Sequence, residues 1–166
     1  MNTKTLILNS KQTKQKINRI VYQIIEHYYD ETEIIFIGIS KRGYLLAKEI
    51  NKVFISYSDI KATLIEAYIN KEKPSFEEIK FTPEIDMKNK IVILIDDVLN
   101  SGSTLMFVAG KLITKKILKM NTVVLVDRRH RKFPVKADWV GLTLSTTLQE
   151  HISVDFTDNN ITVSLE

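Results

Sequence analysis

The 166-residue chain contains no cysteine. This absence excludes disulfide bonds, thiolate zinc sites and cysteine nucleophiles, and it fits a reducing compartment. Only five glycines and three prolines are present, which excludes collagen-like and linker-rich architectures. The longest apolar runs, such as residues 91–95, are too short to span a bilayer. The N-terminus also lacks the apolar core of a signal peptide, so we expect a cytoplasmic protein without membrane segments.

The remaining composition is that of an ordinary globular protein. Hydrophobic residues make up 44% of the chain and charged residues 27%. Wholesale disorder is excluded, because disordered chains have low hydrophobicity. A chain of this length is long enough to bury a substantial core. We therefore expect residues 1–166 to form a single domain.

Positive charge is concentrated in two segments of the chain. Residues 1–25 carry no acid, residues 111–136 carry only Asp127 as an acid, and the tail from Glu150 has acids but no lysine or arginine. The cations of the two segments are Lys4, Lys11, Lys14, Lys16, Arg19, Lys111, Lys115, Lys116, Lys119, Arg128, Arg129, Arg131, Lys132 and Lys136. This distribution favours an anionic partner, such as a phosphate, a nucleotide or RNA. The alternative is that these cations only solvate helix faces.

Three apolar runs rich in β-branched residues predict strands that are buried on both faces, at residues 34–39, 91–95 and 122–126. A further strand is predicted at residues 62–69, and shorter ones near Trp139, at 152–156 and at 161–165. Residues 70–89 predict a loop with one short strand. Helical spacing predicts helices at residues 11–29, capped by Ser10, from the turn Ser40–Gly43 to about Asn51, and at 104–120. The expected core stripe of the last helix is Met106, Ala109, Ile113 and Ile117.

Buried strands that alternate with helices predict an α/β fold with a parallel sheet and right-handed crossovers. In such folds, ligands bind outside the carboxyl ends of the strands. Three segments of this chain lie at those ends: residues 40–43, 96–104 and 127–132. They are therefore the first places to look for a site.

The strongest chemical signal lies in residues 91–104, where an apolar strand leads into Asp96-Asp97 and then into a turn of small residues. Adjacent carboxylates after an apolar strand need a cation or hydroxyl donors as partners. Gly102 in a turn at a helix start lets backbone N–H groups approach an anion. Together these features describe a site for a phosphorylated sugar. The alternative is that the acids are solvated and that Ser103 or Thr104 merely caps the helix.

These residues carry a resemblance to a known family. Residues 91–104 resemble the phosphoribosyl pyrophosphate (PRPP) motif of type I phosphoribosyltransferases. More specifically, the chain is similar to the pyrimidine operon attenuators that are also uracil phosphoribosyltransferases, nearly end to end but with an interruption in the middle loop. Residues 38–43 resemble that family's pyrophosphate loop, and residues 125–131 and 133–141 resemble its segment around the base. The resemblance implies a type I phosphoribosyltransferase fold, with a five-stranded parallel sheet, flanking helices and a small hood from both chain ends.

The resemblance also implies an activity, in which uracil and PRPP give UMP and pyrophosphate with Mg²⁺ as cofactor. Its catalytic residues would be Asp96, Asp97 and Arg42, and the two aspartates would hold the metal. The implied substrate-binding residues are Ser40, Lys41, Arg42, Gly43, Val98, Leu99, Asn100, Ser101, Gly102, Ser103, Thr104, Arg128, Lys136, Trp139 and Val140. In this assignment Trp139 stacks on the base, with core packing as the alternative.

Two positions favour a pyrimidine over a purine. Purine-using relatives carry an acid where Asn100 stands and a lysine where Asp127 stands. The family's mobile loop begins Tyr-Arg-Asp-Asp, whereas residues 68–71 read Tyr-Ile-Asn-Lys. That difference, with the two basic segments, supports an alternative function: a catalytically weak nucleotide sensor that binds RNA. By the same resemblance we expect a homodimer or a higher homo-oligomer.

Overall fold

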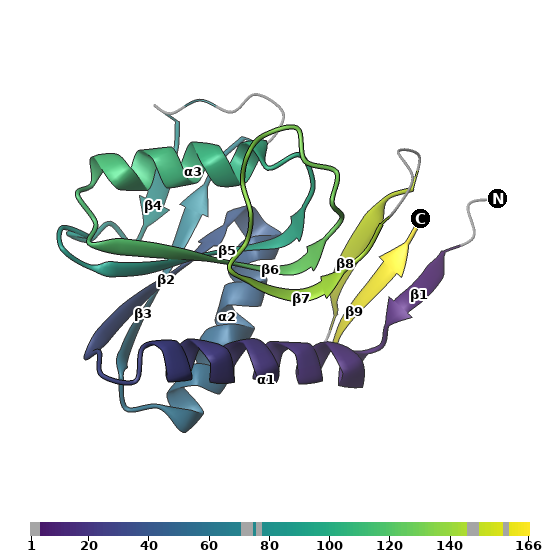
Figure 1. The fold of residues 1–166 in the computed structure, drawn as a ribbon, viewed down its shortest axis with the longest axis horizontal. Coiled ribbons are helices and arrows are strands. Elements are labelled where there is room, and N and C mark those ends of the chain that lie inside the picture. The colour runs from purple at the N-terminus through teal and green to yellow at the C-terminus, as the bar shows by residue number, and fades with distance from the viewer. Residues whose placement is uncertain (1–3, 71–74, 76–77, 146–149, 158–159) are drawn as a thin grey trace.

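The computed structural model describes residues 4–70, 75, 78–145, 150–157 and 160–166. Its central sheet has six strands in the order β4-β3-β2-β5-β6-β7 (Figure 1). The five strands from β3 to β7 in this order are parallel, and β4 pairs with β3 in antiparallel fashion at one edge. The strands are β2 (Glu33–Ile39), β3 (Lys61–Tyr68), β4 (Lys80–Thr82), β5 (Ile91–Leu99), β6 (Lys119–Asp127) and β7 (Trp139–Thr143). The predicted five-stranded parallel core is confirmed.

Helices cover both faces of the central sheet. The helices α1 (Ser10–His27) and α2 (Ser40–Tyr57) lie on one face, and α3 (Ser103–Thr114) lies on the other (Figure 1). Each face has its own apolar core, and every residue of β5 is buried. Continuous apolar runs therefore form the central strands, because neither face of these strands meets water.

The two chain ends form a second sheet, which we call the hood. It consists of β1 (Thr5–Leu8), β9 (Asn160–Leu165) and β8 (Ile152–Thr157), all antiparallel, with β9 in the middle. The strand β8 contacts α2 and β5, so the hood stands beside the carboxyl end of the central sheet. This confirms the hood that the resemblance implied. In the described part of the chain, no helix has the length and apolarity needed to cross a membrane.

The start of α1 differs from the prediction by one residue. Asn9, not Ser10, is the N-cap: its side chain accepts from the backbone N–H of Gln12 at 2.9 Å, and the Gln12 side chain accepts from the Asn9 N–H at 2.9 Å. This reciprocal arrangement satisfies two N–H groups that otherwise have no partner at a helix start. Ser10 becomes the first helical residue, because asparagine with glutamine three positions later outcompetes a lone serine.

The core stripe predicted for the last helix is half right. Ala109 and Ile117 are partly buried and pack against the core, but Met106 is 40% exposed and Ile113 is 66% exposed. The buried residues of α3 are Leu105, Val108 and Leu112. The sequence predicts a helix at residues 104–120, but α3 ends at Thr114 and β6 begins at Lys119. Residues 105–109 are all apolar, so helical spacing alone fits more than one choice of buried face.

The buried hydroxyl of Tyr28 should make the free energy of unfolding depend on pH in the alkaline range. Its hydroxyl donates to Oδ1 of Asn121. Burial raises the pKa of Tyr28 to about 12, with smaller contributions from the charges of Asp138 and Glu31. An unfolded tyrosine has a pKa of about 10. The neutral form of Tyr28 therefore stabilises the fold fully below pH ~10, and the free energy of unfolding falls as the pH rises toward ~12.

Tyr28→Phe should remove this decrease in the free energy of unfolding between pH 8 and pH 11, measured by urea unfolding, because phenylalanine does not ionise. The substitution should also cost about 1 kcal/mol at pH 8 through the lost hydrogen bond. If the variant loses as much stability as the unmodified protein between these pH values, Tyr28 is not responsible for the decrease.

Candidate active site

The two aspartates of the PRPP-like motif lie within β5, not after it. The sequence predicts that the strand ends at Ile95, but β5 continues to Leu99 and buries both acids, each 5% exposed. The backbone N–H of Asp97 donates to Oδ1 of Asp96 at 3.0 Å. Successive side chains of a strand point to opposite faces. Accordingly, Asp96 lines one pocket and Asp97 lines another.

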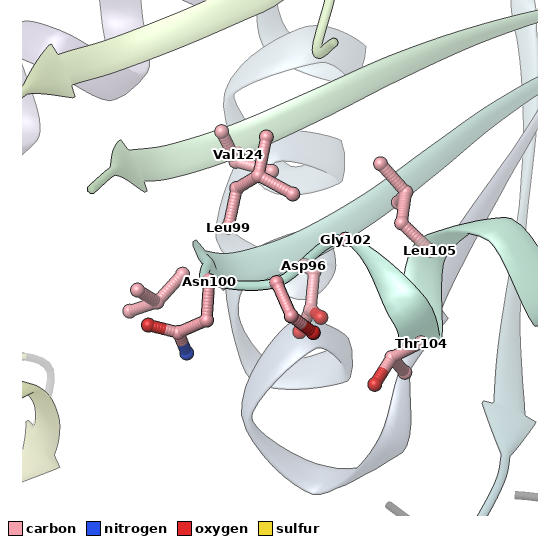
Figure 2. A pocket seen from close by; sticks show the side chains of 9 residues that line it. Asp96, Leu99, Asn100, Gly102, Thr104, Leu105 and Val124 are labelled. Carbon is pink, nitrogen blue, oxygen red and sulfur yellow. The ribbon is translucent and has the colours of Figure 1, made fainter. Parts of the chain in front are cut away.

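The smaller pocket has a volume of about 70 Å³ and lies between the end of β5 and the start of α3. Its lining residues are Asp96, Val98, Leu99, Asn100, Ser101, Gly102, Thr104, Leu105 and Val124. Figure 2 shows the carboxylate of Asp96, the amide of Asn100 and the hydroxyl of Thr104 on one side of the loop, and the apolar side chains of Leu99, Leu105 and Val124 on the other. The pocket therefore has a polar side and an apolar side.

The backbone of this loop has the conformation expected of an anion cradle. Gly102 is the N-cap of α3 and has a φ of 85°, a left-handed conformation that favours glycine. The N-cap Gly102 has no side chain to cap the helix and no acid stands in the first turn, so the dipole at this helix start favours an anion. The N–H of Ser103 donates to the hydroxyl of Ser101 at 3.3 Å. This geometry suits a phosphate group.

The larger pocket, of about 350 Å³, joins three elements that are distant in the sequence. The start of α2 contributes Ser40, Lys41 and Arg42, the end of β5 contributes Asp97, Val98 and Asn100, and the hood side contributes His151 and Ile152. The structure thus brings the candidate pyrophosphate loop and one aspartate to the same cavity. The sequence analysis does not single out His151, which is exposed and lies directly before β8.

The segment that resembles a pyrophosphate loop is the first turn of α2. The sequence predicts a turn at residues 40–43 and a helix that ends near Asn51, but the helix begins at Ser40 and continues to Tyr57. Ser40 makes the sharp corner alone, with a φ of 52°, and its hydroxyl donates to the carbonyl of Ile69 at 3.2 Å. Gly43 does not line the pocket. A Cβ there would lie 2.8 Å from the carbonyl oxygen of Ile95, so this glycine allows α2 to approach β5.

Arg128 joins the segment after β6 to the phosphate cradle and to the hood side. The residue is buried, its Nη1 donates to Oδ1 of Asn100 at 2.9 Å, and its Nη2 donates to the carbonyl of Glu150. Asp127 is also buried, pairs with Arg131 and accepts from the N–H of Arg129 at 2.9 Å. These polar contacts hold the segment that follows β6 in place beside the end of β5.

Three residues of the predicted base site line neither pocket. The ring of Trp139 lies against α1, with its centroid 5.6 Å from that of His27 and 6.3 Å from that of Tyr28. The carbonyl of Val140 accepts from Arg19 at 2.8 Å, and Lys136 is exposed. These contacts match core packing of Trp139, the alternative to stacking on a base.

The carboxylates fit a cation that the substrate also coordinates. In the described ranges, no group of three or more His, Asp or Glu side chains could hold a metal ion. Mg²⁺ is usually bound through one or two carboxylates together with substrate phosphates. Asp96 and Asp97, buried beside two polar pockets, match that requirement.

A parallel α/β sheet with a glycine turn at a helix start and a pocket lined by Lys41 and Arg42 at its carboxyl edge defines an α/β protein of the kind that binds ligands at that edge. Comparison with known proteins narrows that class. Residues 4–159 match the phosphoribosyl transferase domain family. The chain therefore belongs to the phosphoribosyl transferase domain family.

The relatives and the solved structures agree with this membership. The chain is 32% identical to the bifunctional protein PyrR of Clostridium novyi (strain NT), over 93% of this chain and 91% of that protein. It is also 32% identical to the bifunctional protein PyrR of Streptococcus sanguinis (strain SK36), over 96% and 94%. The hypoxanthine phosphoribosyltransferase of Trypanosoma cruzi shares the fold, with a TM-score of 0.76 over 96% of this chain and 95% of that chain, at 15% identity.

Proposed function

We propose that the protein transfers the phosphoribosyl group of PRPP to uracil, giving UMP and pyrophosphate, with Mg²⁺ as cofactor. The observation that carries this proposal is the placement of two buried aspartates between a small anion cradle and a larger basic pocket. PRPP has a 5′-phosphate at one end and a pyrophosphate at the other. Two separate anion pockets on either side of a pair of carboxylates match that layout.

The smaller pocket suits the 5′-phosphate. Its N–H groups at the start of α3 and the hydroxyl of Thr104 are the donors that a phosphate requires. Asp96 lines the same pocket (Figure 2), where its carboxylate can accept from a ribose hydroxyl. Asp97, on the opposite face of the strand, has the same relation to the larger pocket.

The larger pocket suits the pyrophosphate. Breaking the bond between C1 of the ribose and the pyrophosphate oxygen places positive charge on the ring and negative charge on the leaving group. Lys41 and Arg42 are positioned to stabilise the leaving group, and Asp97 to stabilise the ring. A bound Mg²⁺ would add neutralising charge to the pyrophosphate oxygens.

The preference for a pyrimidine rests on Asn100 and Asp127. Both side chains are engaged, Asn100 with Arg128 and Asp127 with Arg131. Position 100 therefore lacks the acid, and position 127 lacks the lysine, that purine-using relatives carry there. A base that needs neither partner, such as uracil, is compatible with this region.

The direct test is an assay with PRPP, Mg²⁺ and a panel of bases, with nucleotide products separated by chromatography. UMP from uracil, with little product from hypoxanthine or guanine, is the expected result. No product from any base at high enzyme concentration would refute turnover. Product from purines alone would refute the choice of base.

Removing the two cations of the larger pocket tests its assignment to pyrophosphate. Lys41→Ala and Arg42→Ala should each raise KM for PRPP by about 10-fold or more, because each removes a charge-assisted contact to a phosphate group. UMP affinity should change less, since UMP has no pyrophosphate. Lys52→Ala is the matched control, because Lys52 is an exposed cation of α2 that does not line the pocket. Equal losses of PRPP and UMP affinity would contradict the assignment.

A second candidate function is nucleotide-dependent RNA binding with weak turnover. The observation that favours it is Ile69, which is 3% exposed and packs in the core at the position of the family's loop arginine. Lys71, which follows in the same motif, lies outside the described residues. Gel shifts with the leader of the protein's own operon, with and without UMP and at several salt concentrations, test this function. Binding that responds to neither UMP nor salt would refute it.

A further inference from the structure

We propose that His151 contacts the pyrophosphate of PRPP from the hood side of the larger pocket, as a substrate-binding residue. This inference rests on the proposed function and deepens it. His151 lines the same cavity as Lys41 and Arg42, but it comes from the opposite end of the chain. The smaller pocket, which suits the 5′-phosphate, contains no histidine. The shared cavity is the reason to assign His151 to pyrophosphate and not to the 5′-phosphate.

The backbone on both sides of His151 is fixed. Its N–H donates to the carbonyl of Glu166, and its carbonyl accepts from the N–H of Glu166, both at 2.8 Å. Ile152, the next residue, is 2% exposed and belongs to the apolar core. The side chain of His151 is exposed, so it reaches solvent at the pocket from a rigid strand end and is free to meet a ligand.

Arg128 ties this strand end to the phosphate cradle. The guanidinium donates to the carbonyl of Glu150, directly before His151, and to Oδ1 of Asn100, which lines both pockets. The two contacts hold the segment before β8 against the end of β5. A bound pyrophosphate would then lie between the start of α2 and His151.

The chemistry of an imidazole suits this position. Neutral or protonated, the ring offers at least one N–H donor, and a hydrogen bond to a charged phosphate oxygen is stronger than a neutral one. The charged residues that line the same pocket are Lys41 and Arg42 from α2 and Asp97 from β5. Lys41 and Arg42 would contact pyrophosphate from the start of α2, and His151 would donate to it from the hood side of the same pocket.

The test compares three ligands on three variants by calorimetry. His151→Ala should weaken the binding of magnesium pyrophosphate and of PRPP by about 5- to 10-fold, the loss of one charge-assisted hydrogen bond. UMP affinity should not change. His151→Gln, which keeps an N–H donor, should recover part of the loss. The control is Lys14→Ala, which removes an exposed cation of α1 that lines neither pocket.

The outcomes separate this inference from the proposed function. If His151→Ala binds pyrophosphate as the unmodified protein does, the role of His151 is refuted and the proposed function stands. Equal losses for UMP and pyrophosphate would refute the placement of pyrophosphate beside His151. If the unmodified protein binds neither PRPP nor pyrophosphate, the proposed function fails, and this inference fails with it.

Discussion

Replacing Asp97 by asparagine is expected to lower kcat/KM for PRPP by about 100-fold or more. The carboxylate lies at the carboxyl end of β5 in the larger pocket, next to the position proposed for the reacting ribose carbon. Removal of one preorganised electrostatic partner of a transition state typically costs about 100- to 1,000-fold in rate. Asparagine has nearly the same shape as aspartate, so the fold should survive. We also expect weaker PRPP binding by calorimetry, because the carboxylate is a candidate ligand of the Mg²⁺ that accompanies PRPP.

The matched control is Asp155→Asn on the hood. Asp155 lies in β8, is exposed, and accepts from the hydroxyl of Thr157 at 2.7 Å. The substitution makes the same change in charge and shape outside both pockets, so activity should not change. Thermal melting of both variants distinguishes a local effect from loss of fold. Wild-type turnover and PRPP affinity in Asp97→Asn would overturn the role assigned to this aspartate.

The position of the two candidate pockets could be predicted because parallel strands bring their carboxyl ends to one edge of a sheet. Residues 40–43 and 96–104 each follow an apolar run, so the sequence alone assigns them to the same region although they are far apart in the chain. Gly102 was informative for a related reason. A glycine between small polar residues at a helix start indicates a left-handed backbone, and the φ of 85° confirms it.

Periodicity predicted that α3 exists but not which face it buries. Residues 105–109 are all apolar, so the sequence fits several stripes, and only packing on β5 and β6 selects Leu105 and Val108. Trp139 illustrates the same limit. The face of the sheet to which a strand side chain points depends on how the strand pairs with its neighbour. The register of β7 on β6 pairs Trp139 with Val123. Its ring then lies against α1, a contact that no local pattern encodes.

His151 could not have been found from local sequence. Its place in the pocket depends on pairing between β8 and β9 and on the contact of β8 with α2 and β5. The contact with α2 joins segments from opposite ends of the chain. The only local signal was a polar side chain directly before a short alternating strand, which is common on protein surfaces.

The second large effect is expected at Gly102. Gly102→Ala should weaken UMP and PRPP binding by about 100-fold and lower the free energy of unfolding by about 1–3 kcal/mol. The backbone there has a φ of 85°, which side chains rarely adopt. An added Cβ would also lie 2.2 Å from Cγ1 of Val135. The loop must therefore move, and the N–H groups that form the phosphate cradle move with it.

Pyrophosphate binding separates this effect from general damage. Because pyrophosphate is assigned to the other pocket, its affinity should fall much less than that of UMP in Gly102→Ala. Gly110→Ala is the control: Gly110 lies inside α3 with ordinary helical geometry, so alanine there should stabilise the helix by about 0.5–1 kcal/mol. Adding Val135→Ala to Gly102→Ala removes the colliding methyl group but not the backbone strain. It should restore part of the UMP affinity, whereas unchanged UMP binding in Gly102→Ala itself would show that the phosphate does not occupy this loop.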